Sequence, residues 1–330
     1  MDKIKYGVIG VGGLGQHHAR WASRIDAIEF AGIYDIDIAR AEKIAGDIGC
    51  KLFTSMDELL AQVDAVSVVT TTTSHCEVAL KVIHAGKHLL IEKPIAATLE
   101  EADRIIAAAE AKGVKLTVGH IERFNPALHG LDDYALRPSF IEAHRLAAFN
   151  PRGADVAVVL DLMIHDIDLA LHLIKSPVKT IAASAVAVVS DSEDIANARL
   201  TFENGAVANL TASRISLQPM RKLRIFQGLG YFSLDLAKKQ ADLYRILDDK
   251  AVTGEFVLPL GESGKKIGYV KKSGDDKDML EAEISAFVNA VKNNTDVIIT
   301  GNEGRAALAV ALQVISESKK AAELFRTHER

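Results

Sequence analysis

Cysteine and aromatic residues are scarce in this chain. Among 330 residues there are 2 cysteines, 1 tryptophan, 6 tyrosines and 11 phenylalanines. Cys50 and Cys76 cannot supply the several disulfides on which small secreted domains depend, and such sparing use of cysteine is typical of the reducing cytoplasm. We therefore expect a cytoplasmic protein that is held together by an apolar core.

Long uncharged segments and an excess of basic charge are also missing. The longest nearly uncharged apolar segment, 181–189, is about half of the roughly 20 residues that a membrane-spanning helix needs. Lys and Arg number 39 against 44 Asp and Glu, so the formal net charge is -5. General nucleic-acid binding requires a basic surface instead. We expect neither membrane nor nucleic-acid partners, and the length suggests about two domains.

The first part of the chain alternates apolar runs with helix-like segments. The expected strands are 4–9, 28–34, 51–54, 65–70, 88–91 and 116–119, and the expected helices are 14–25, 38–48, 56–60, 75–85 and 99–112. Near-continuous Val, Ile and Leu runs suit parallel strands that are buried on both faces. Thr98 and Glu101 form the pattern of a capping box before the last helix. Residues 1–122 are therefore predicted to form a doubly wound parallel sheet.

The pattern changes after residue 122. We expect helices at 127–136, 158–174, 279–292 and 303–324, and strands at 139–146, 180–189, 195–202, 207–213, 222–227 and 231–235. Asn204-Gly205 is a strong hairpin signal. The stretch 261–278 has the lysines and glycines of a mobile surface loop. Residues 123–330 are predicted to form an α/β domain with a large, mainly antiparallel open sheet.

A glycine-rich turn follows the first expected strand. Its sequence is Gly10-Val11-Gly12-Gly13-Leu14-Gly15, and it opens the first expected helix. In a dinucleotide fingerprint Gly10 permits the tight turn, Gly12 lets the backbone approach the pyrophosphate, and Gly15 permits close packing of helix and strand. The helix N-terminus then faces the anion. The alternative is a glycine-rich turn without a ligand.

Asp35 lies 20 residues after Gly15, at the end of the second expected strand. A carboxylate there binds both ribose hydroxyls of NAD and repels the extra phosphate of NADP. Arg40 is near enough in sequence to compensate for this repulsion. We therefore predict NAD as the cofactor, with NADP less favoured; the alternative for Asp35 is a helix N-cap.

Two further strand ends carry polar residues. Thr70 and Thr71 begin a hydroxyl-rich run that ends at His75, and these three are candidate cofactor contacts, although Ser74 could instead cap the next helix. Glu92-Lys93-Pro94 follows the fifth expected strand, and Glu92 is a further candidate cofactor contact. Lys93 could stabilise a substrate alkoxide, or it could be an ordinary solvated charge.

A polar stripe lies on an otherwise apolar expected helix. Asp161, His165, Asp168 and His172 fall within a sector about 60° wide if the helix is α-helical. His165 could be a general base that Asp161 orients. The stripe could also hold a metal ion, or form a structural hydrogen-bond network.

Taken in order, these motifs resemble the Gfo/Idh/MocA oxidoreductase family, together with Arg123-Phe124-Asn125-Pro126. The resemblance implies that residues 1–122 are an NAD-binding Rossmann domain and that residues 123–330 are a substrate-binding and oligomerisation domain, an α/β domain whose open sheet often forms an oligomer interface. It also implies hydride transfer between a sugar-type alcohol and NAD(P). It implies that Lys93 and His165 are the acid/base pair, that Asp161 orients or binds substrate, and that no metal is used. A homodimer or homotetramer follows from the same resemblance. Thr71 replaces a proline of many relatives, and the residues before Asp161 lack a common glycine-rich turn.

Three segments resemble one branch of that family, the UDP-N-acetylglucosamine 3-dehydrogenases. They are 119–126, 142–145 and 161–168. The resemblance implies oxidation of the sugar C3 hydroxyl to a ketone, which an aminotransferase then converts to the 3-amino sugar of a lipid A variant. The alternatives are a free-sugar or inositol dehydrogenase, and a non-catalytic dinucleotide-binding regulator.

A nucleotide sugar brings a diphosphate, which requires cations beyond Lys93. The candidate substrate-binding residues are Arg123, Asn125, Arg145 and Arg152. Arginine suits this role because its planar fork matches pairs of phosphate oxygens. The alternative is that these arginines form surface or interface ion pairs.

Overall fold

The computed structural model describes residues 3–150, 156–228, 230–247, 256–259, 265–274 and 277–328. Side chains are described up to residue 325. The chain folds as two compact units, each built from two segments. The first comprises Met1–Phe124 and Lys277–Leu308, and the second comprises Asn125–Asp276 and Ala309–Arg330. The functional division expected at residue 122, into cofactor-binding and substrate-binding domains, stays a prediction.

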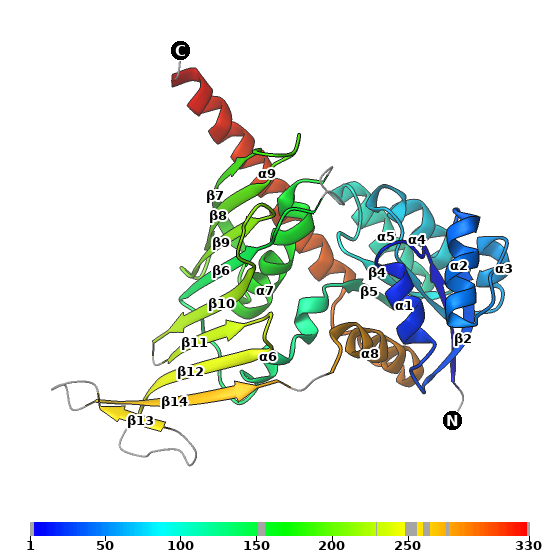
Figure 1. Cartoon of the computed structure of the whole chain (residues 1–330), viewed down its shortest axis with the longest axis horizontal. Helices are drawn as coiled ribbons and strands as arrows, with labels where there is room; N and C mark the ends of the chain where they lie inside the picture. Colours follow the sequence, from blue (N-terminus) through cyan, green and yellow to red (C-terminus); the bar gives the residue numbers. More distant parts are fainter. Residues whose placement is uncertain are drawn as a thin grey trace. The chain divides into compact units, whose positions relative to one another are not determined.

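A parallel five-stranded sheet forms the centre of the first unit, in the order β2-β1-β3-β4-β5 (Figure 1). Its strands are β1 (Ile4–Ile9), β2 (Ile28–Tyr34), β3 (Ala65–Val68), β4 (His88–Glu92) and β5 (Leu116–Gly119). The chain leaves β1 toward β2 and later continues on the other side of β1 with β3. The predicted doubly wound sheet is thus confirmed, and its switch point, where such folds bind ligands, lies between β1 and β3.

Several helices of the first unit begin at a residue whose side chain caps them. The helices of this unit are α1 (Gly15–Ala22), α2 (Ile38–Ile48), α3 (Met56–Leu60), η1 (Thr72–Ser74), α4 (His75–His84), α5 (Leu99–Lys112), η2 (Ile121–Phe124), α8 (Met279–Asn293) and the start of α9 (Gly301–His328). The Thr98 side chain accepts from the Glu101 N–H at 3.2 Å, as the capping box predicts. The Glu101 carboxylate returns to the N–H of Ala97, one residue earlier than that pattern requires.

One expected strand of this unit is wrong. Residues 51–54 form no strand, and Leu52 makes an isolated bridge to Ile33 at the outer side of β2. The segment is too short to continue the sheet because Ser55 already caps α3. Helix α1 is also shorter than 14–25, since the N–H groups of Arg24 and Ile25 both bond to the Trp21 carbonyl in a turn.

Helix α8 supplies part of the first unit's core although it lies late in the sequence. Its Leu280, Ile284 and Phe287 are buried in one cluster with residues of β1 and α1. The Phe287 ring meets the Tyr6 ring edge-on, with centroids 6.3 Å apart. The core beneath β1 is therefore closed by residues nearly 280 positions away in the chain.

A nine-stranded sheet forms the second unit, in the order β13-β14-β12-β11-β10-β6-β9-β8-β7. Its strands are β6 (Phe140–Leu146), β7 (Val178–Val186), β8 (Ile195–Phe202), β9 (Val207–Ser213), β10 (Met220–Gln227), β11 (Gly230–Asp235), β12 (Gln240–Leu247), β13 (Phe256–Pro259) and β14 (Lys266–Ser273). Every pairing is antiparallel except that of β6 with β9. The predicted large, mainly antiparallel sheet is confirmed.

The expected loop at 261–278 is wrong where the structure describes it. Strand β14 (Lys266–Ser273) lies within it and pairs along its whole length with β12. Its Lys266 and Lys271 are exposed whereas Gly268 is buried, so the polar composition belongs to a partly exposed strand. The hairpin at Asn204-Gly205 is confirmed: Gly205 has φ of +85°, and the Asn204 side chain accepts from the Ala206 N–H at 3.0 Å.

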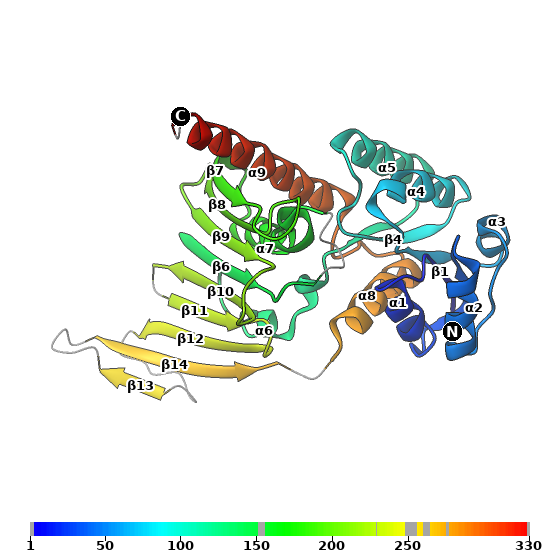
Figure 2. The ribbon, with the colours of Figure 1, turned by 45° about the horizontal axis from the view of Figure 1, so that its top comes forward.

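Helices cover one face of this sheet. They are α6 (Pro126–His129), the π-helical turn η3 (Val159–Met163), α7 (Ile164–Ile174) and the second part of α9. Helix α7 packs on β6 and β9, and Figures 1 and 2 show α7 and α9 on the same side of the sheet. The expected helix at 127–136 is wrong in length, because α6 ends at His129 and is followed by turns.

Candidate active site

Four glycines shape the turn between β1 and α1. Gly10 has φ of +87°, and a Cβ on it would lie 2.6 Å from the Val69 carbonyl oxygen. A Cβ on Gly15 would lie 1.9 Å from the carbonyl oxygen of Gly10. At Gly12 a Cβ would meet Arg40 Nη1 at 3.4 Å, and at Gly13 it would meet no described atom within 4 Å. Two glycines thus close the turn, and the space beside the other two is open for an anion before the helix N-terminus.

Asp35 lies at the end of β2 and is tied to this turn. One of its carboxylate oxygens accepts from the Val11 N–H at 2.7 Å, and the other accepts from the Asp37 N–H at 2.9 Å. The carboxylate is buried, with 6% of the residue exposed. Asp37, and not Asp35, caps α2, because its side chain accepts from the Arg40 N–H. The N-cap alternative for Asp35 is therefore wrong.

Arg40 stands beside both aspartates. Its guanidinium forms a close ion pair with Asp37, and its Nη1 lies 4.0 Å from Asp35 Oδ2. The hydrogen bonds from Arg40 hold the pKa of Asp37 below its usual range. Arg40 is thus positioned near Gly12 and Asp35, where it can moderate the negative charge that a cofactor phosphate would meet.

His75 ties together the loops that follow β3 and β4. Its Nδ1 lies 2.9 Å from the Pro94 carbonyl oxygen and its Nε2 lies 3.2 Å from that of Thr70. Burial lowers the pKa of His75, so the neutral ring donates its one N–H to one of these carbonyls. Both nitrogens face the protein backbone, which favours a structural role over direct contact with a cofactor.

The hydroxyl run before α4 forms its own small network. Ser74 Oγ bonds to Thr70 Oγ1 at 2.9 Å and to the Thr71 carbonyl at 2.8 Å. It makes no side-chain bond to the first N–H groups of α4, so the alternative of Ser74 as a helix cap is wrong. Thr71 is exposed at the ligand-binding end of β3, where it remains a predicted cofactor contact.

Lys93 directly follows β4 and is half-buried, which separates it from an ordinary solvated lysine. Its backbone N–H donates to Glu92 Oε2 at 3.2 Å. The other oxygen of Glu92 lies 3.0 Å from Nε2 of His18, a fully buried residue of α1. Sequence reasoning missed His18, although a histidine three positions after Gly15 on the inner side of the first helix was a usable signal.

The predicted stripe in the second unit does not lie on one continuous α-helix. Asp161 belongs to the π-helical turn η3, in which the Ile164 N–H bonds to the Val159 carbonyl, and α7 begins only at Ile164. The α-helical rotation assumed between Asp161 and His165 is therefore wrong at Asp161, since a π turn rotates less per residue. Such turns are frequent at functional sites. Asp161 and His165 are both half-buried.

The other members of the stripe have different surroundings. Asp168 is 1% exposed, whereas His172 is exposed. Among the described residues no group of three or more His, Cys, Asp or Glu could hold a metal ion. None of the described helices is long and apolar enough to cross a membrane.

Arg145 and Asp166 form a buried bidentate pair beneath α7. Arg145 Nε lies 3.0 Å from Asp166 Oδ2, and Nη2 lies 2.8 Å from Oδ1. About 4% of each side chain is exposed. The geometry favours the ion-pair alternative for Arg145 over contact with a substrate diphosphate, and it fixes α7 to β6.

Two more of the predicted phosphate ligands have structural partners. Arg123 Nη2 bonds to Glu303 Oε1 at 3.2 Å with 4% of its side chain exposed. Asn125 caps α6 through the Ala127 N–H and donates to the Leu236 carbonyl at 3.0 Å. Arg152 lies outside the described residues.

The start of η3 is held by Arg214, which pairs with Asp194. Sequence reasoning missed both residues. Arg214 Nη2 donates to the carbonyls of Val156 and Glu193, and the Val158 N–H donates to Glu193 as well. The neighbouring Asp194 accepts from three consecutive backbone N–H groups, at 2.6–2.9 Å. Burial of Asp194 opposes its charge, but these bonds hold its pKa well below the usual range. The segment that leads into Asp161 is thereby anchored.

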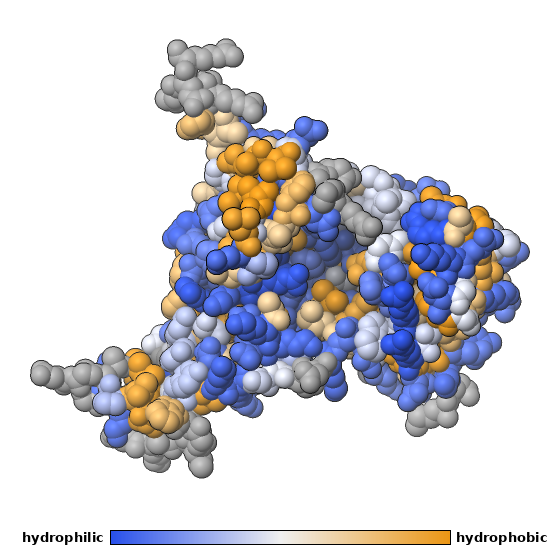
Figure 3. Space-filling model, viewed as in Figure 1, coloured by the Kyte–Doolittle hydropathy of each residue, from blue (hydrophilic) through white to orange (hydrophobic). Residues whose placement is uncertain are grey.

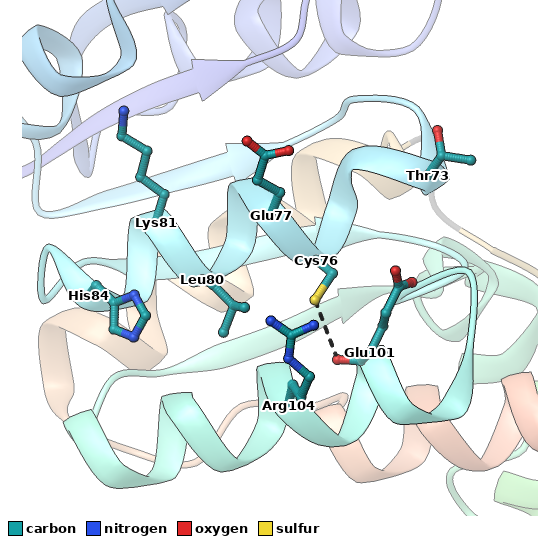
Figure 4. Close-up of a pocket in the computed structure, with 8 residues that line it drawn as sticks. All are labelled: Thr73, Cys76, Glu77, Leu80, Lys81, His84, Glu101 and Arg104. Atoms are coloured by element: carbon teal, nitrogen blue, oxygen red, sulfur yellow. Dashed lines mark hydrogen bonds between the residues drawn. The ribbon is translucent and has the colours of Figure 1, made fainter.

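A cavity of about 550 Å³ lies between α4 and α5 (Figure 4). Cys76 and Arg104 face each other across it, and Cys76 Sγ is 3.9 Å from the Glu101 carbonyl oxygen. Burial raises the pKa of the Cys76 thiol. None of the predicted site residues lines this cavity, so it is separate from the glycine turn.

Two family models match the chain. The model "Oxidoreductase family, NAD-binding Rossmann fold" covers residues 4–120, and "GFO/IDH/MocA C-terminal domain" covers residues 139–231. UDP-N-acetylglucosamine 3-dehydrogenase of Acidithiobacillus ferrooxidans is 41% identical over 315 residues, which is 95% of this chain and 97% of the relative. A solved structure of that enzyme superposes with a TM-score of 0.87 at 39% identity, over 96% of this chain and 98% of that one. Inositol 2-dehydrogenase of Rhizobium meliloti is 26% identical over 333 residues, 93% of this chain and 94% of the relative.

Proposed function

Because the chain belongs to the Gfo/Idh/MocA family of NAD-binding oxidoreductases, we propose that it oxidises the C3 hydroxyl of UDP-N-acetylglucosamine to a ketone, with NAD as the cofactor. The observation that carries this proposal is the 41% identity to a UDP-N-acetylglucosamine 3-dehydrogenase over nearly the full length of both chains. The identity to an inositol 2-dehydrogenase is 26%, which supports a free-sugar or inositol substrate less well.

The residues of the glycine turn fit a dinucleotide. The open space beside Gly12 and Gly13 would hold the pyrophosphate against the N-terminus of α1, and Asp35 would bind the adenosine ribose. The short backbone bonds to Asp35 keep its carboxylate fixed, and each oxygen retains a lone pair for a ribose hydroxyl. This arrangement supports NAD over NADP, although Arg40 reduces the difference.

Alcohol oxidation requires removal of the hydroxyl proton as hydride leaves the carbon. NAD, when bound, accepts that hydride. His165 would take the proton, since a reference pKa of about 6.5 suits a base near neutral pH. Lys93 would stabilise the alkoxide by its charge. Asp161, on the π-helical turn before α7, would orient His165 or bind the sugar. A non-catalytic regulator has no use for both Lys93 and His165.

The structure changes which residues we propose for the diphosphate. Arg145 and Arg123 are buried in ion pairs, and Asn125 is used in a helix cap. We assign these three to positioning the segments around the substrate. Arg152 remains a candidate for direct contact with phosphate oxygens, and we add the exposed Asn150 as a neutral donor. The ketone product suits transamination in the synthesis of an amino sugar for the cell envelope.

The second unit offers a surface for a homodimer or homotetramer. Phe226, Tyr231, Tyr244 and Tyr269 stack in a row across β10, β11, β12 and β14, with successive centroids 4.8, 5.3 and 4.9 Å apart. Since neighbouring residues such as Ile225 and Phe232 point into the core, this row lies on the opposite face of the sheet. Figure 3 shows further hydrophobic areas over β7 and β13. Light scattering would test the assembly.

The experiment supplies NAD with UDP-N-acetylglucosamine, UDP-glucose, N-acetylglucosamine or inositol. An aminotransferase and an amino donor remove the ketone, because its formation can be unfavourable at equilibrium. We expect kcat/KM to be highest for UDP-N-acetylglucosamine. Turnover of free N-acetylglucosamine or inositol with equal efficiency would overturn the nucleotide-sugar proposal.

A further inference from the structure

A line of buried polar side chains crosses the core of the first unit beneath the glycine turn. Tyr6 Oη lies 2.7 Å from Ser67 Oγ, Ser67 Oγ lies 3.0 Å from His18 Nδ1, and His18 Nε2 lies 3.0 Å from Glu92 Oε1. Tyr6, Ser67 and His18 are 0% exposed and Glu92 is 7% exposed. Burying four polar side chains is costly unless each is hydrogen-bonded, and here each of the four has a hydrogen-bond partner.

One set of proton positions satisfies the whole line. Tyr6 donates to Ser67, Ser67 donates to Nδ1 of a neutral His18, and Nε2–H of His18 donates to Glu92. Burial raises the pKa of Tyr6 well above its usual range, so this hydroxyl keeps its proton. Burial also opposes ionisation of Glu92, but the hydrogen bond from His18 and the charge of Lys93 hold its pKa below the usual range.

The line ends at the backbone of Lys93. The second oxygen of Glu92 accepts from the Lys93 N–H at 3.2 Å, and a Cβ on Gly119 would lie 2.9 Å from Glu92 Cδ, so the carboxylate is confined. On the other side of Lys93, His75 holds the Pro94 carbonyl at 2.9 Å. The backbone is therefore held at the Lys93 N–H and at the carbonyl of the residue that follows Lys93.

Other titratable groups face this line from the surrounding elements. Among the described residues these are His75 on α4 and Glu283 on α8. Burial lowers the pKa of His75, and the charge of Glu92 acts in the opposite direction. The charge of Glu283 adds to the raised pKa of Tyr6. Glu283 is 2% exposed. Neither lies between His18 and Glu92, so the His18–Glu92 contact is the one that reaches Lys93 directly.

We propose that His18 is a positioning residue for Lys93: it holds the Glu92 carboxylate where one oxygen binds the Lys93 N–H and the negative charge acts on the Lys93 ammonium. This proposal rests on the role assigned to Lys93 in the proposed function. Its consequence is that Lys93 stays protonated, and able to stabilise an alkoxide, at a higher pH than an isolated half-buried lysine. The same contact connects the helix of the glycine turn to the lysine.

The substitutions are His18→Gln, His18→Asn and Glu92→Gln. The amide nitrogen of glutamine reaches the position of Nε2 and can donate to Glu92, whereas that of asparagine reaches the position of Nδ1 and faces Ser67. His18→Gln is therefore the matched control for His18→Asn. Tm and the Kd of NADH, measured for each variant, report on folding and on the glycine turn.

The direct readout is the pKa of Lys93, from NMR titration of protein whose lysines are reductively methylated with ¹³C. The Lys93 signal is assigned by its absence in Lys93→Arg. We expect Glu92→Gln to lower this pKa by about 1 or more, because an opposite charge nearby favours the ammonium. His18→Asn should lower it as well, and His18→Gln should restore it. An unchanged pKa of Lys93 in both Glu92→Gln and His18→Asn would overturn the proposal. If His18→Asn does not fold, the pKa of Lys93 in Glu92→Gln alone decides.

The pH profile of kcat/KM is the functional readout. With a turned-over substrate, the alkaline limb should move to lower pH in Glu92→Gln and His18→Asn and stay in place in His18→Gln. An unmoved limb despite a lowered Lys93 pKa would refute the role of Lys93 in the proposed function, while the positioning of Lys93 by His18 would stand. The two failures are therefore distinguishable.

Discussion

The two units hold their candidate functional groups by different means. In the first, the ligand-binding edge is shaped by backbone: glycines without room for a Cβ, and N–H groups that bind Asp35 and Glu92. In the second, Asp161 and His165 follow a π-helical turn that is anchored by charged side chains, chiefly Arg214 and Arg145. The backbone arrangement suits a cofactor that is the same in different enzymes of a family. The side chains that anchor the second arrangement can be replaced when the substrate differs.

The largest expected effect concerns the reacting groups themselves. His165→Ala and Lys93→Ala should each lower kcat by about 10²–10⁴, the range typical of a lost acid or base, while NADH binding is retained. His172→Ala is the control because it lies on the same helix and is exposed. Near-full turnover in either active-site variant would remove that residue from the mechanism.

The second prediction tests whether charged pairs hold the second unit. Arg145→Ala should lower the free energy of unfolding by about 3–5 kcal/mol, since it leaves Asp166 buried without its partner. Arg305→Ala is the control: it breaks an exposed pair with Asp103, for which about 0–1 kcal/mol is usual. Urea unfolding measures both. Similar small losses would show that the Arg145 pair does not anchor α7; a specific rise in KM at full stability would instead support substrate contact.

The third prediction tests the backbone character of the first unit. Gly15→Ala places a Cβ 1.9 Å from the Gly10 carbonyl oxygen. This oxygen belongs to the backbone, so it cannot easily move away from the new Cβ. Overpacking of this kind costs about 1–3 kcal/mol, so NADH should bind up to roughly a hundredfold more weakly. Gly46→Ala, on α2, adds a Cβ that meets no described atom within 4 Å apart from its own helix backbone, and it should leave the Kd unchanged. Equal Kd values for both variants and the wild type would contradict this account of the turn.

The smallest expected effect concerns the choice of cofactor. Asp35→Ser should narrow the NAD/NADP ratio of kcat/KM by about tenfold, because it removes a repulsion of about 1 kcal/mol or more. Arg40 partly offsets that repulsion in the wild type, being 4.0 Å from Asp35. The ratio is measured with each cofactor at saturating sugar. Equal values for NAD and NADP in the wild type would refute the role of Asp35.

How far the sequence predicts each unit follows from the range of the interactions. Strand β1, the glycine turn and the Thr98 cap depend on neighbours within a few positions, and these were predictable. The contact of His18 with Glu92 joins residues 74 positions apart, and that of Arg145 with Asp166 joins residues 21 apart. No local pattern reports such partners, so Arg145 was interpreted as a phosphate ligand. Strand β14 was missed because its exposed lysines resemble a loop until β12 is seen beside it.

The most direct test of the central claim follows one hydrogen atom. UDP-N-acetylglucosamine that carries deuterium at C3 is incubated with the enzyme and NAD in a single turnover, and the reduced cofactor is analysed by mass spectrometry. The account predicts that the reduced cofactor carries one deuterium and that the sugar product is a 3-ketone. Reduced cofactor without deuterium, or label that stays on the sugar, would contradict oxidation at C3.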